Sequence, residues 1–120
     1  MGQGSIIGYE INEKTCQISF YNEKDLEPDT LEVDTDNYQI PLIIGKLRDT
    51  WAYGKEAKRL VTIKDGFTAT RLLSKSLAGD KIEFGEETYD AVWLLSQFIQ
   101  MSLQSFPEID GIVFTVPSLS

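Results

Sequence analysis

The sequence predicts a single domain, residues 1–120, of mixed α and β structure, either α+β or α/β. Three observations indicate this class. The first half of the chain holds paired β-rich segments, a long amphipathic pattern follows, and an apolar β-rich segment comes last. We therefore expect a mixed β-sheet with N-terminal antiparallel hairpins, one long amphipathic helix and a final parallel strand.

The first hairpin is predicted from two β-rich segments, Ser5–Ile11 and Thr15–Tyr21, joined by a three-residue connection. Asn12 opens this connection and is able to adopt the left-handed backbone conformation that tight turns use. Apolar and more polar side chains alternate in the second segment, which predicts one buried face and one polar face. The predicted buried face holds Cys16, Ile18 and Phe20.

The next part of the chain predicts a long connection and a second hairpin. Residues 22–37 are polar, acidic and interrupted by Pro28, which favours a loop with a short extended piece at residues 31–33. An apolar run at residues 40–47 and the segment 51–53 are separated by a polar break, as in a hairpin. The chain then leaves the hairpin at a glycine.

Two short helices and a strand are expected to follow. The helices are predicted at residues 55–61 and 67–77, and the second helix would end at Gly79. Their inner sides would hold Ala57, Leu60 and Val61 in the first helix, and Phe67, Leu73 and Leu77 in the second. The strand is predicted at residues 81–84.

The strongest helical periodicity lies at residues 87–105, before Pro107. The apolar residues at helical spacing are Val92, Leu95, Phe98, Ile99, Leu103 and Phe106. Residues 112–116 then form an apolar segment that is interrupted only by Thr115. Such a segment is typical of a parallel strand that is covered on both faces, and Thr115 would be a hydroxyl bonded locally inside it.

The charge of the chain excludes one class of function. Nineteen acidic and eleven basic residues give a net charge of -8, which argues against a nucleic-acid binder. Eight of the eleven cations lie within residues 46–75, so the chain also has a basic segment. Solvated surfaces explain this distribution, and an acidic partner that docks on the basic segment is the alternative.

The residue content limits the chemistry as well. The chain has one cysteine, Cys16, and no histidine, so Ser/His/Asp and Cys/His nucleophile systems and His- or Cys-based zinc sites are excluded. Cys16 is expected to be a small half-buried hydrophobe. No apolar run is long enough to cross a membrane and no signal-peptide pattern is visible, so the sequence predicts no membrane partner and a cytoplasmic location.

Three segments, in order, resemble the heat-shock-chaperone branch of the actin-like ATPases. These are Ile6–Cys16 (IIGYEINEKTC), residues 40–57 (IPLIIGKLRDTWAYGKEA) and residues 89–117, which end in GIVFTVP. They are similar to the first phosphate loop, to a Pro-Ser-x-Val strand with its following helix, and to the long helix before an Ala-Val-Ile-Thr-Val-Pro strand. The resemblance spans nearly the whole chain and implies a partial ribonuclease-H-like fold.

The resemblance also implies a set of ligand-binding residues. In the family, an Asp-x-Gly turn offers backbone N–H groups to the phosphates of ATP and a carboxylate to magnesium or its waters. Here Glu10 stands in place of the Asp and Asn12 in place of the Gly, while Glu13, Lys14 and Thr15 follow in the turn. These five residues are the implied cofactor-binding set, and Glu10 is the implied metal-facing residue. The alternative for Glu10 is a carboxylate that only faces solvent.

By the same resemblance, the nucleotide lies between two related halves, and the second phosphate turn comes later than the Thr-Val-Pro strand. We therefore expect this chain to be an N-terminal fragment of a longer actin-like ATPase-type protein. ATP and magnesium would bind the full-length parent, whereas the fragment would bind no cofactor and be inactive. Its expected partner is the remainder of the parent chain.

Two further functions stay open at this stage. The first is a non-catalytic protein-interaction module that keeps the fold and has lost nucleotide binding, with a surface near Trp51, Tyr53 and Lys55. The second is a two-metal nuclease that uses carboxylates such as Glu10 and Asp110. The net charge of -8 disfavours the nuclease because no basic surface lies near Glu10 in the sequence.

Overall fold

A computed structural model describes residues 5–21, 29–30, 39–104, 106 and 108–116 of the chain. The strands are β1 (Ser5–Ile11), β2 (Thr15–Tyr21), β3 (Asp29–Thr30), β4 (Gln39–Pro41), β5 (Ile44–Leu47), β6 (Thr50–Tyr53), β7 (Gly66–Ala69), β8 (Lys81–Phe84), β9 (Glu87–Asp90) and β10 (Ile109–Thr115). The helices are α1 (Gly54–Arg59), a 3-10 turn (Leu60–Thr62), α2 (Leu72–Ala78) and α3 (Ala91–Ser102). The described chain is therefore a mixed α+β structure.

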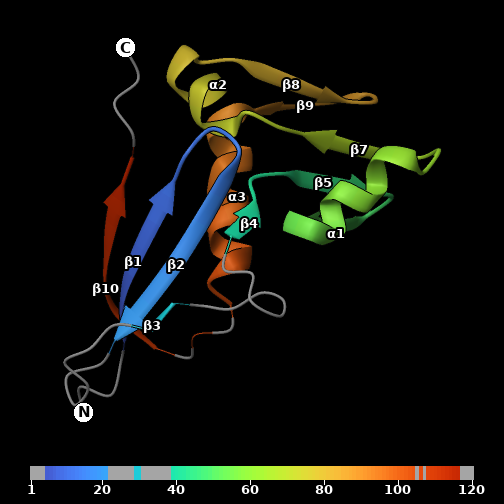
Figure 1. The fold of residues 1–120 in the computed structure, drawn as a ribbon. Helices are drawn as coiled ribbons and strands as arrows, with labels where there is room; N and C mark the ends of the chain where they lie inside the picture. Colours follow the sequence, from blue (N-terminus) through green and yellow to red (C-terminus); the bar gives the residue numbers. More distant parts are fainter. Residues whose placement is uncertain (1–4, 22–28, 31–38, 105, 107, 117–120) are drawn as a thin grey trace.

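The strands of the described residues form three sheets. The largest has the order β10-β1-β2-β3, and β4 also pairs with β2. In it β1 pairs antiparallel with β2 and parallel with β10, so the sheet is mixed. The second sheet has the order β6-β5-β7, and the third is the hairpin β8-β9. Figure 1 shows the largest sheet on one side of the molecule, with α3 behind it.

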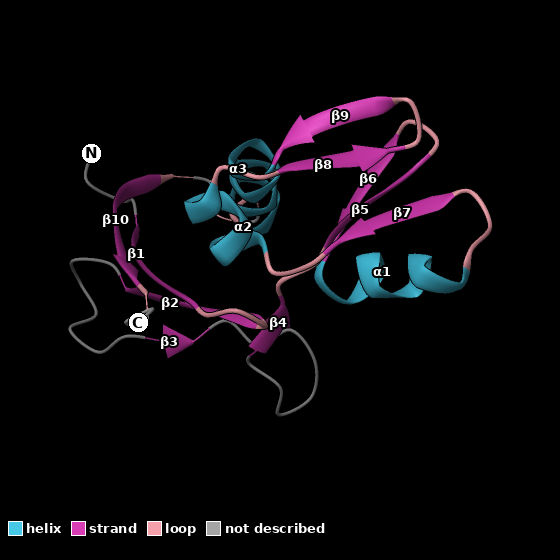
Figure 2. Ribbon diagram, turned by 90° about the horizontal axis from the view of Figure 1, so that it is seen from above, coloured by secondary structure: helices cyan, strands magenta, loops and turns pink. Residues whose placement is uncertain are grey.

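The core lies between the largest sheet and α3. Alternate residues of β1 and β2 enter it, because successive side chains of a strand point to opposite faces. These residues are Ile7, Tyr9, Ile11, Cys16 and Ile18. From α3 they meet Leu94 and Phe98, which are fully buried. Figure 2 shows α2 and α3 together on one side of this sheet, with the two smaller sheets beyond them.

The sheet and the final strand confirm the central expectation from the sequence. The hairpin β1–β2 has the predicted bounds, its predicted alternation places Cys16 and Ile18 inside, and β10 pairs parallel with β1. The second hairpin, β5–β6, is also present. The apolar run at residues 40–47 is divided, however, because β4 joins the first sheet and β5 the second. The piece predicted at residues 31–33 lies outside the described residues.

The helix predicted at residues 67–77 is half wrong. Its first part is the strand β7, which pairs antiparallel with β5 from Gly66 to Ala69. The partner strand overrides the local helical pattern, since Phe67 and Thr68 suit a strand equally well. The second part is α2, which ends as predicted at Gly79, whose φ of 72° is the left-handed conformation that glycine adopts without strain. The predicted inner residue Leu77 is exposed.

The long helix predicted at residues 87–105 begins four residues late. Residues Glu87–Asp90 form β9, which pairs with β8 across a two-residue turn, and α3 begins at Ala91. Gly85 in that turn has a φ of 66°, as expected for a hairpin with glycine in its first central position. Val92 lies on the exposed side of this helix, so the prediction that it is buried is wrong. The short helix is also shorter than predicted, and Val61 lies outside its buried side.

The prediction that the last strand is covered on both faces is wrong for the described chain. β10 lies at the edge of its sheet and pairs only with β1 among the described strands. Val113 and Phe114 point to opposite faces, yet they are 62% and 50% exposed. Thr115 is exposed as well. β10 therefore has the composition of an inner strand and the exposure of an edge strand.

Candidate functional site

The turn between β1 and β2 is organised by the side chain of Asn12. Its Oδ1 accepts hydrogen bonds from the backbone N–H of Lys14 at 2.9 Å and of Thr15 at 2.8 Å, and from the Thr15 hydroxyl at 3.2 Å. Among the described residues other than glycine, only Arg48 and Arg71 have a positive φ. The expectation of a left-handed Asn12 is therefore wrong, because its side chain shapes the turn instead.

A polar row crosses four strands beside this turn. Glu10 of β1 is in register with Thr115 of β10 and with Gln17 of β2, and Gln17 is in register with Gln39 of β4. Directly opposed residues on neighbouring strands point to the same face of a sheet. The four side chains therefore lie in one line, on the face opposite to Tyr9.

The polar row lines a cavity of about 270 Å³. The lining residues are Glu10, Ile11, Asn12, Thr15, Gln17, Gln39, Thr115 and Val116. The cavity lies where the parallel strands β1 and β10 both end, which is the usual place for a ligand in a sheet with parallel strands. We take it as the candidate functional site.

The cavity contains three of the five residues that the sequence implied. Glu10, Asn12 and Thr15 line it, whereas Glu13 and Lys14 do not. The Glu13 carboxylate accepts a hydrogen bond from the Ser74 hydroxyl of α2, and its other oxygen is buried with no hydrogen-bond partner among the described residues. The Lys14 side chain is exposed. The Glu13 side chain therefore links the hairpin to α2, and this contact explains why Glu13 does not line the cavity.

Three polar residues of the site were missed from the sequence. Gln17 and Gln39 belong to different strands, and only the register of the sheet brings them beside Glu10. Thr115 was interpreted as a buried hydroxyl, whereas it is exposed and lines the cavity. The one signal in the sequence was spacing, since Gln17 follows Thr15 at the period of two that keeps residues on one face.

The cavity offers oxygen atoms and one negative charge. Among its lining residues Glu10 is the single carboxylate, and none is Lys or Arg. Carboxylate, carboxamide and hydroxyl oxygens suit a hard cation such as Mg²⁺ or its water ligands. Within the described ranges, however, no three acidic, Cys or His residues gather as a metal cluster. Within these ranges Glu10 is therefore a single carboxylate without the further protein ligands that a metal centre needs.

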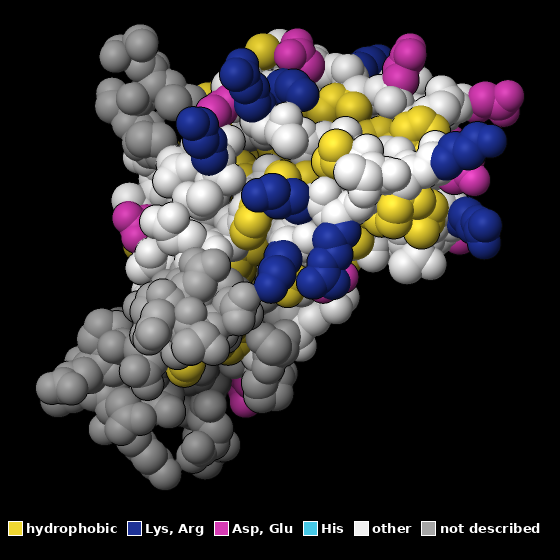
Figure 3. All heavy atoms as spheres, turned by 45° about the vertical axis from the view of Figure 1, so that its right-hand side comes forward, with side chains coloured by type: hydrophobic (Ala, Val, Ile, Leu, Met, Phe, Trp, Pro, Cys, Tyr) yellow, Lys and Arg dark blue, Asp and Glu magenta, His cyan; other side chains and the backbone are white. Residues whose placement is uncertain are grey.

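A second, larger cavity of about 620 Å³ shares the lining residue Gln39 with the first. Its lining includes Trp51, Tyr53, Lys55, Lys58 and Met101. It contains all three residues that the sequence analysis proposed for a protein-interaction surface. Figure 3 shows the side of the molecule that carries α1, β5 and β7, where Lys and Arg side chains lie among exposed hydrophobic side chains. Unlike the first cavity, this one is not lined by a row of polar side chains in register on neighbouring strands.

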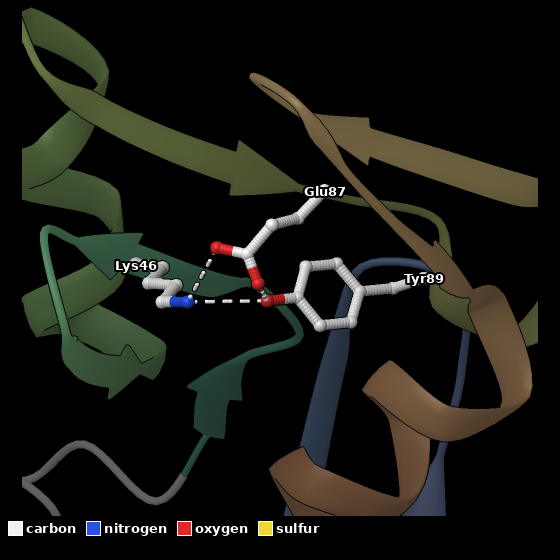
Figure 4. Close-up of polar contacts among 3 residues, drawn as sticks. All are labelled: Lys46, Glu87 and Tyr89. Atoms are coloured by element: carbon white, nitrogen blue, oxygen red, sulfur yellow. Dashed lines mark hydrogen bonds and ion pairs between the residues drawn. The ribbon is translucent and has the colours of Figure 1, made fainter.

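A third polar cluster surrounds Lys46 of β5 (Figure 4). Its Nζ donates to Glu87 Oε1 at 3.0 Å and to the Tyr89 hydroxyl at 3.1 Å, and it lies 5.3 Å from the centre of the Trp51 ring. The Tyr89 hydroxyl donates to the other Glu87 oxygen at 2.7 Å. Hydrogen bonds with Tyr89 and then Glu87 raise the pKa of Lys46, and those from Tyr89 and then Lys46 lower the pKa of Glu87. Every polar group of the cluster has a partner. The contacts of Lys46 with Glu87 and Tyr89 join β5 to the β8–β9 hairpin.

The comparisons with known proteins give a family and a fold. A family model described as the family of unknown function (DUF5716) C-terminal matches residues 27–120. No curated protein matches the chain. Among solved structures, a non-polymerising mutant of the actin-like protein MamK bound to AMPPNP is similar, with a TM-score of 0.63 and 11% sequence identity. The match covers 98% of this chain and 34% of that chain, so the chain spans about a third of the MamK structure.

The similarity to MamK concerns the fold, because 11% identity is too low to carry function. It agrees with the actin-like resemblance seen in the sequence, at the level of a mixed α+β subdomain. In the described part of the chain, no helix is long and apolar enough to cross a membrane.

Proposed function

Because the chain belongs to the family of unknown function (DUF5716) C-terminal and is similar in fold to part of an actin-like protein, we propose that it is one subdomain of an actin-like protein and forms one wall of a nucleotide site. The observation that carries this proposal is the position of the 270 Å³ cavity at the ends of β1 and β10. We also propose that the fold is ribonuclease-H-like and that the protein is cytoplasmic.

In this proposal Glu10 orients the waters of a magnesium ion, and the polar row faces the phosphate end of the nucleotide. ATP is the nucleotide that the sequence resemblance implies, and the similar MamK structure is bound to AMPPNP. The fit is partial, since a single carboxylate lines the cavity and no cation does. The remaining contacts would come from a second half of the protein, and hydrolysis would require that half.

The exposed edge of β10 supports the proposal that the protein has a second half. A strand that is apolar on both faces is typical of the inside of a sheet, and an exposed apolar edge favours pairing with a further strand. Ile112, Val113 and Phe114 are all more than a third exposed in the described structure. We propose that residues 1–120 are one part of a longer protein, and that another part of the parent chain pairs with β10 and completes the site.

Calorimetry with Mg-ATP tests the proposal. The parent protein should bind Mg-ATP, whereas the 120-residue chain should give no detectable heat. Glu10→Gln in the parent should weaken binding at least about 10-fold, as expected for loss of a charged contact. Asp110→Asn is the matched control, because Asp110 is an exposed carboxylate of β10 that does not line the cavity. Tight binding by the 120-residue chain alone would show that the site is complete without a second half.

A second function is supported by two other observations. The Asn12 side chain already accepts the turn N–H groups that a phosphate would need, and the larger cavity contains Trp51 and Tyr53 beside lysines. Both favour an interaction module that keeps the fold without the nucleotide. In that case the parent protein would give no heat with Mg-ATP, and Trp51→Ala would abolish binding of a protein partner while Glu10→Gln would not.

A further inference from the structure

The outer edge of β6 has no strand partner among the described residues. The sheet order is β6-β5-β7, so β6 pairs on one side only. The N–H of Gly54, directly after β6, donates to the Ile43 carbonyl oxygen on the β5 side at 2.9 Å. Successive residues of a strand direct their N–H groups to opposite edges, and Tyr53 is extended, with φ -138° and ψ 161°. The N–H groups of Tyr53 and Trp51 therefore point away from β5, to the outer edge.

The cavity of about 620 Å³ lies along this outer edge. Trp51, Ala52 and Tyr53 all line it. A cavity over one face of a strand would be lined by alternate residues, so three consecutive lining residues place the cavity along the edge. Its lining also includes the whole of β4, Gln39–Pro41, which belongs to the largest sheet. Ligand pockets usually measure about 300–1,000 Å³, so the cavity has room for a short extended segment beside the backbone donors.

The two faces of β6 bring different surroundings to the cavity. The Tyr53 ring packs edge to face on a ring of α3 at 5.6 Å, so Tyr53 and Trp51 lie on the face toward α3. Ala52 lies on the opposite face and is in register with Gly45. The Leu60 side chain, directly after α1, packs against Gly45. One face of β6 is therefore aromatic, and the other face carries α1.

The helix α1 brings basic side chains to the cavity. Lys55 and Lys58 line it and are exposed. Glu56, the one carboxylate of the lining, pairs with Arg59 at 3.1 Å. Figure 3 shows Lys and Arg side chains on the side of the molecule that carries α1, although the chain has a net charge of -8. Because opposite charges across an interface attract and orient a partner, this face favours acidic side chains.

We propose that an extended acidic peptide of a partner protein adds to the outer edge of β6 as a further strand of the sheet β6-β5-β7. Main-chain hydrogen bonds supply the affinity in this mode of binding, and pockets for alternate side chains supply the specificity. The acidic side chains meet the lysines of α1, and the apolar side chains between them meet Trp51 and Tyr53. The inference goes beyond the nucleotide proposal and gives a partner class to the interaction module.

The test is a fluorescence-polarisation screen of the 120-residue chain against short synthetic peptides. Alternate positions of these peptides are Asp or Glu, and the positions between them are Val, Ile, Leu, Phe, Tyr or Trp. Lys58→Glu should weaken binding of the best peptide at least about 10-fold, because repulsion replaces attraction. Lys64→Glu is the matched control, since Lys64 is an exposed lysine outside the cavity, and it should change binding less than about 2-fold.

Hydrogen exchange followed by NMR separates strand addition from charge attraction alone. The best peptide should slow exchange of the Trp51 and Tyr53 amides, because they gain partners on the outer edge. The Ala52 amide faces β5, so it should be protected with and without peptide, which also confirms that each variant is folded. A peptide that is N-methylated at the amides facing β6 should lose binding, whereas one methylated at the alternate amides should keep it.

Four results would overturn the inference. The outer edge would not be a peptide site if no member of the set bound at about 1 mM. Binding that left exchange of the Trp51 and Tyr53 amides unchanged would show attraction to surface charge alone. Equal effects of Lys58→Glu and Lys64→Glu would remove the cavity from the interaction. A dimer of the chain in which these two amides are protected would make a second copy the occupant.

The peptide screen and the Mg-ATP experiment can fail separately. Failure of the screen would remove the strand addition and leave the nucleotide proposal, which depends on the cavity beside Glu10. Peptide binding together with a parent protein that ignores Mg-ATP would support the strand addition and remove the nucleotide function.

Discussion

The two faces of the largest sheet differ in how their polar groups are partnered. On the face toward α3, the Cys16 thiol donates to the Tyr9 hydroxyl at 3.8 Å, and the Tyr9 and Ser102 hydroxyls lie 2.5 Å apart. The Ser102 hydroxyl donates to the Ile99 carbonyl at 2.8 Å, which leaves its oxygen to accept from Tyr9. On the opposite face, Glu10 has no hydrogen bond or ion pair with any described residue.

This difference indicates that the adjacent residues Tyr9 and Glu10 of β1 have separate roles. Tyr9 is 1% exposed, so its hydroxyl must find partners inside the protein. Glu10 is exposed at the wall of a cavity, where it is available to a ligand. The face toward α3 should therefore govern stability, and the cavity face should govern binding.

The largest expected effect comes from the core beneath the buried face. Phe98 is fully buried, and its ring meets that of Tyr53 edge to face at 5.6 Å. Phe98→Ala should lower the free energy of unfolding by about 4 kcal/mol, measured by urea denaturation, because it removes a large apolar side chain and leaves a cavity. Val92→Ala, on the exposed side of the same helix, should change it by less than about 0.5 kcal/mol. Similar losses in both variants would show that α3 does not cover the sheet as described.

The second effect is a loss of stability at alkaline pH. Burial raises the pKa of Cys16 from 9.0 to about 11, against a smaller lowering by its hydrogen bond with Tyr9. The unfolded thiol ionises first as the pH rises, so this stabilisation is present below pH 9 and is lost between pH 9 and 11. The loss should reach about 2 kcal/mol.

Cys16→Ala isolates this contribution, because burial also raises the pKa of Tyr9. Urea denaturation at several pH values should show that the variant loses less stability than the wild type between pH 9 and 11. Parallel curves for the two proteins would mean that the thiol is not buried as described.

The third effect concerns the buried hydrogen bonds of the Tyr9 hydroxyl with Cys16 and Ser102. Tyr9→Phe removes the hydroxyl that accepts from Cys16 and bonds to Ser102. We expect a loss of about 1 kcal/mol in thermal or urea unfolding, the usual net value of a buried hydrogen bond. Tyr53→Phe is the matched control, since no hydrogen bond of its hydroxyl is found in the described part of the chain. An equal effect of the two changes would argue against a special role for the Tyr9 hydroxyl.

The elements that the sequence predicted correctly differ from those that it did not in what defines them. The alternation in β2 identified Cys16 and Ile18 as buried, because this pattern depends only on the strand itself. The segments 67–69 and 87–90 were predicted as helix because their pairing with β5 and with β8 is not visible in the local pattern. Local periodicity therefore identified the elements that pack by their own pattern and failed for those that a partner strand defines.

The candidate site was also predictable from the sequence only in part. The resemblance to the actin-like family led to Glu10, Asn12 and Thr15, which lie within six residues of one another in the chain. Gln39 and Thr115 come from distant segments, and only the register of β4 and β10 brings them to the cavity. The bonds of Asn12 to its own turn depend on side-chain rotation, which no spacing in the sequence specifies.

The smallest expected effect is the most informative about the cavity face. Glu10→Gln keeps the size of the side chain and removes its charge, and it breaks no hydrogen bond to a described residue. Its free energy of unfolding should therefore stay within about 0.5 kcal/mol of the wild type in urea denaturation. A loss above about 1 kcal/mol would mean that the carboxylate has a structural partner. Glu10 would then be occupied within the protein, and both faces of the sheet would serve stability alone.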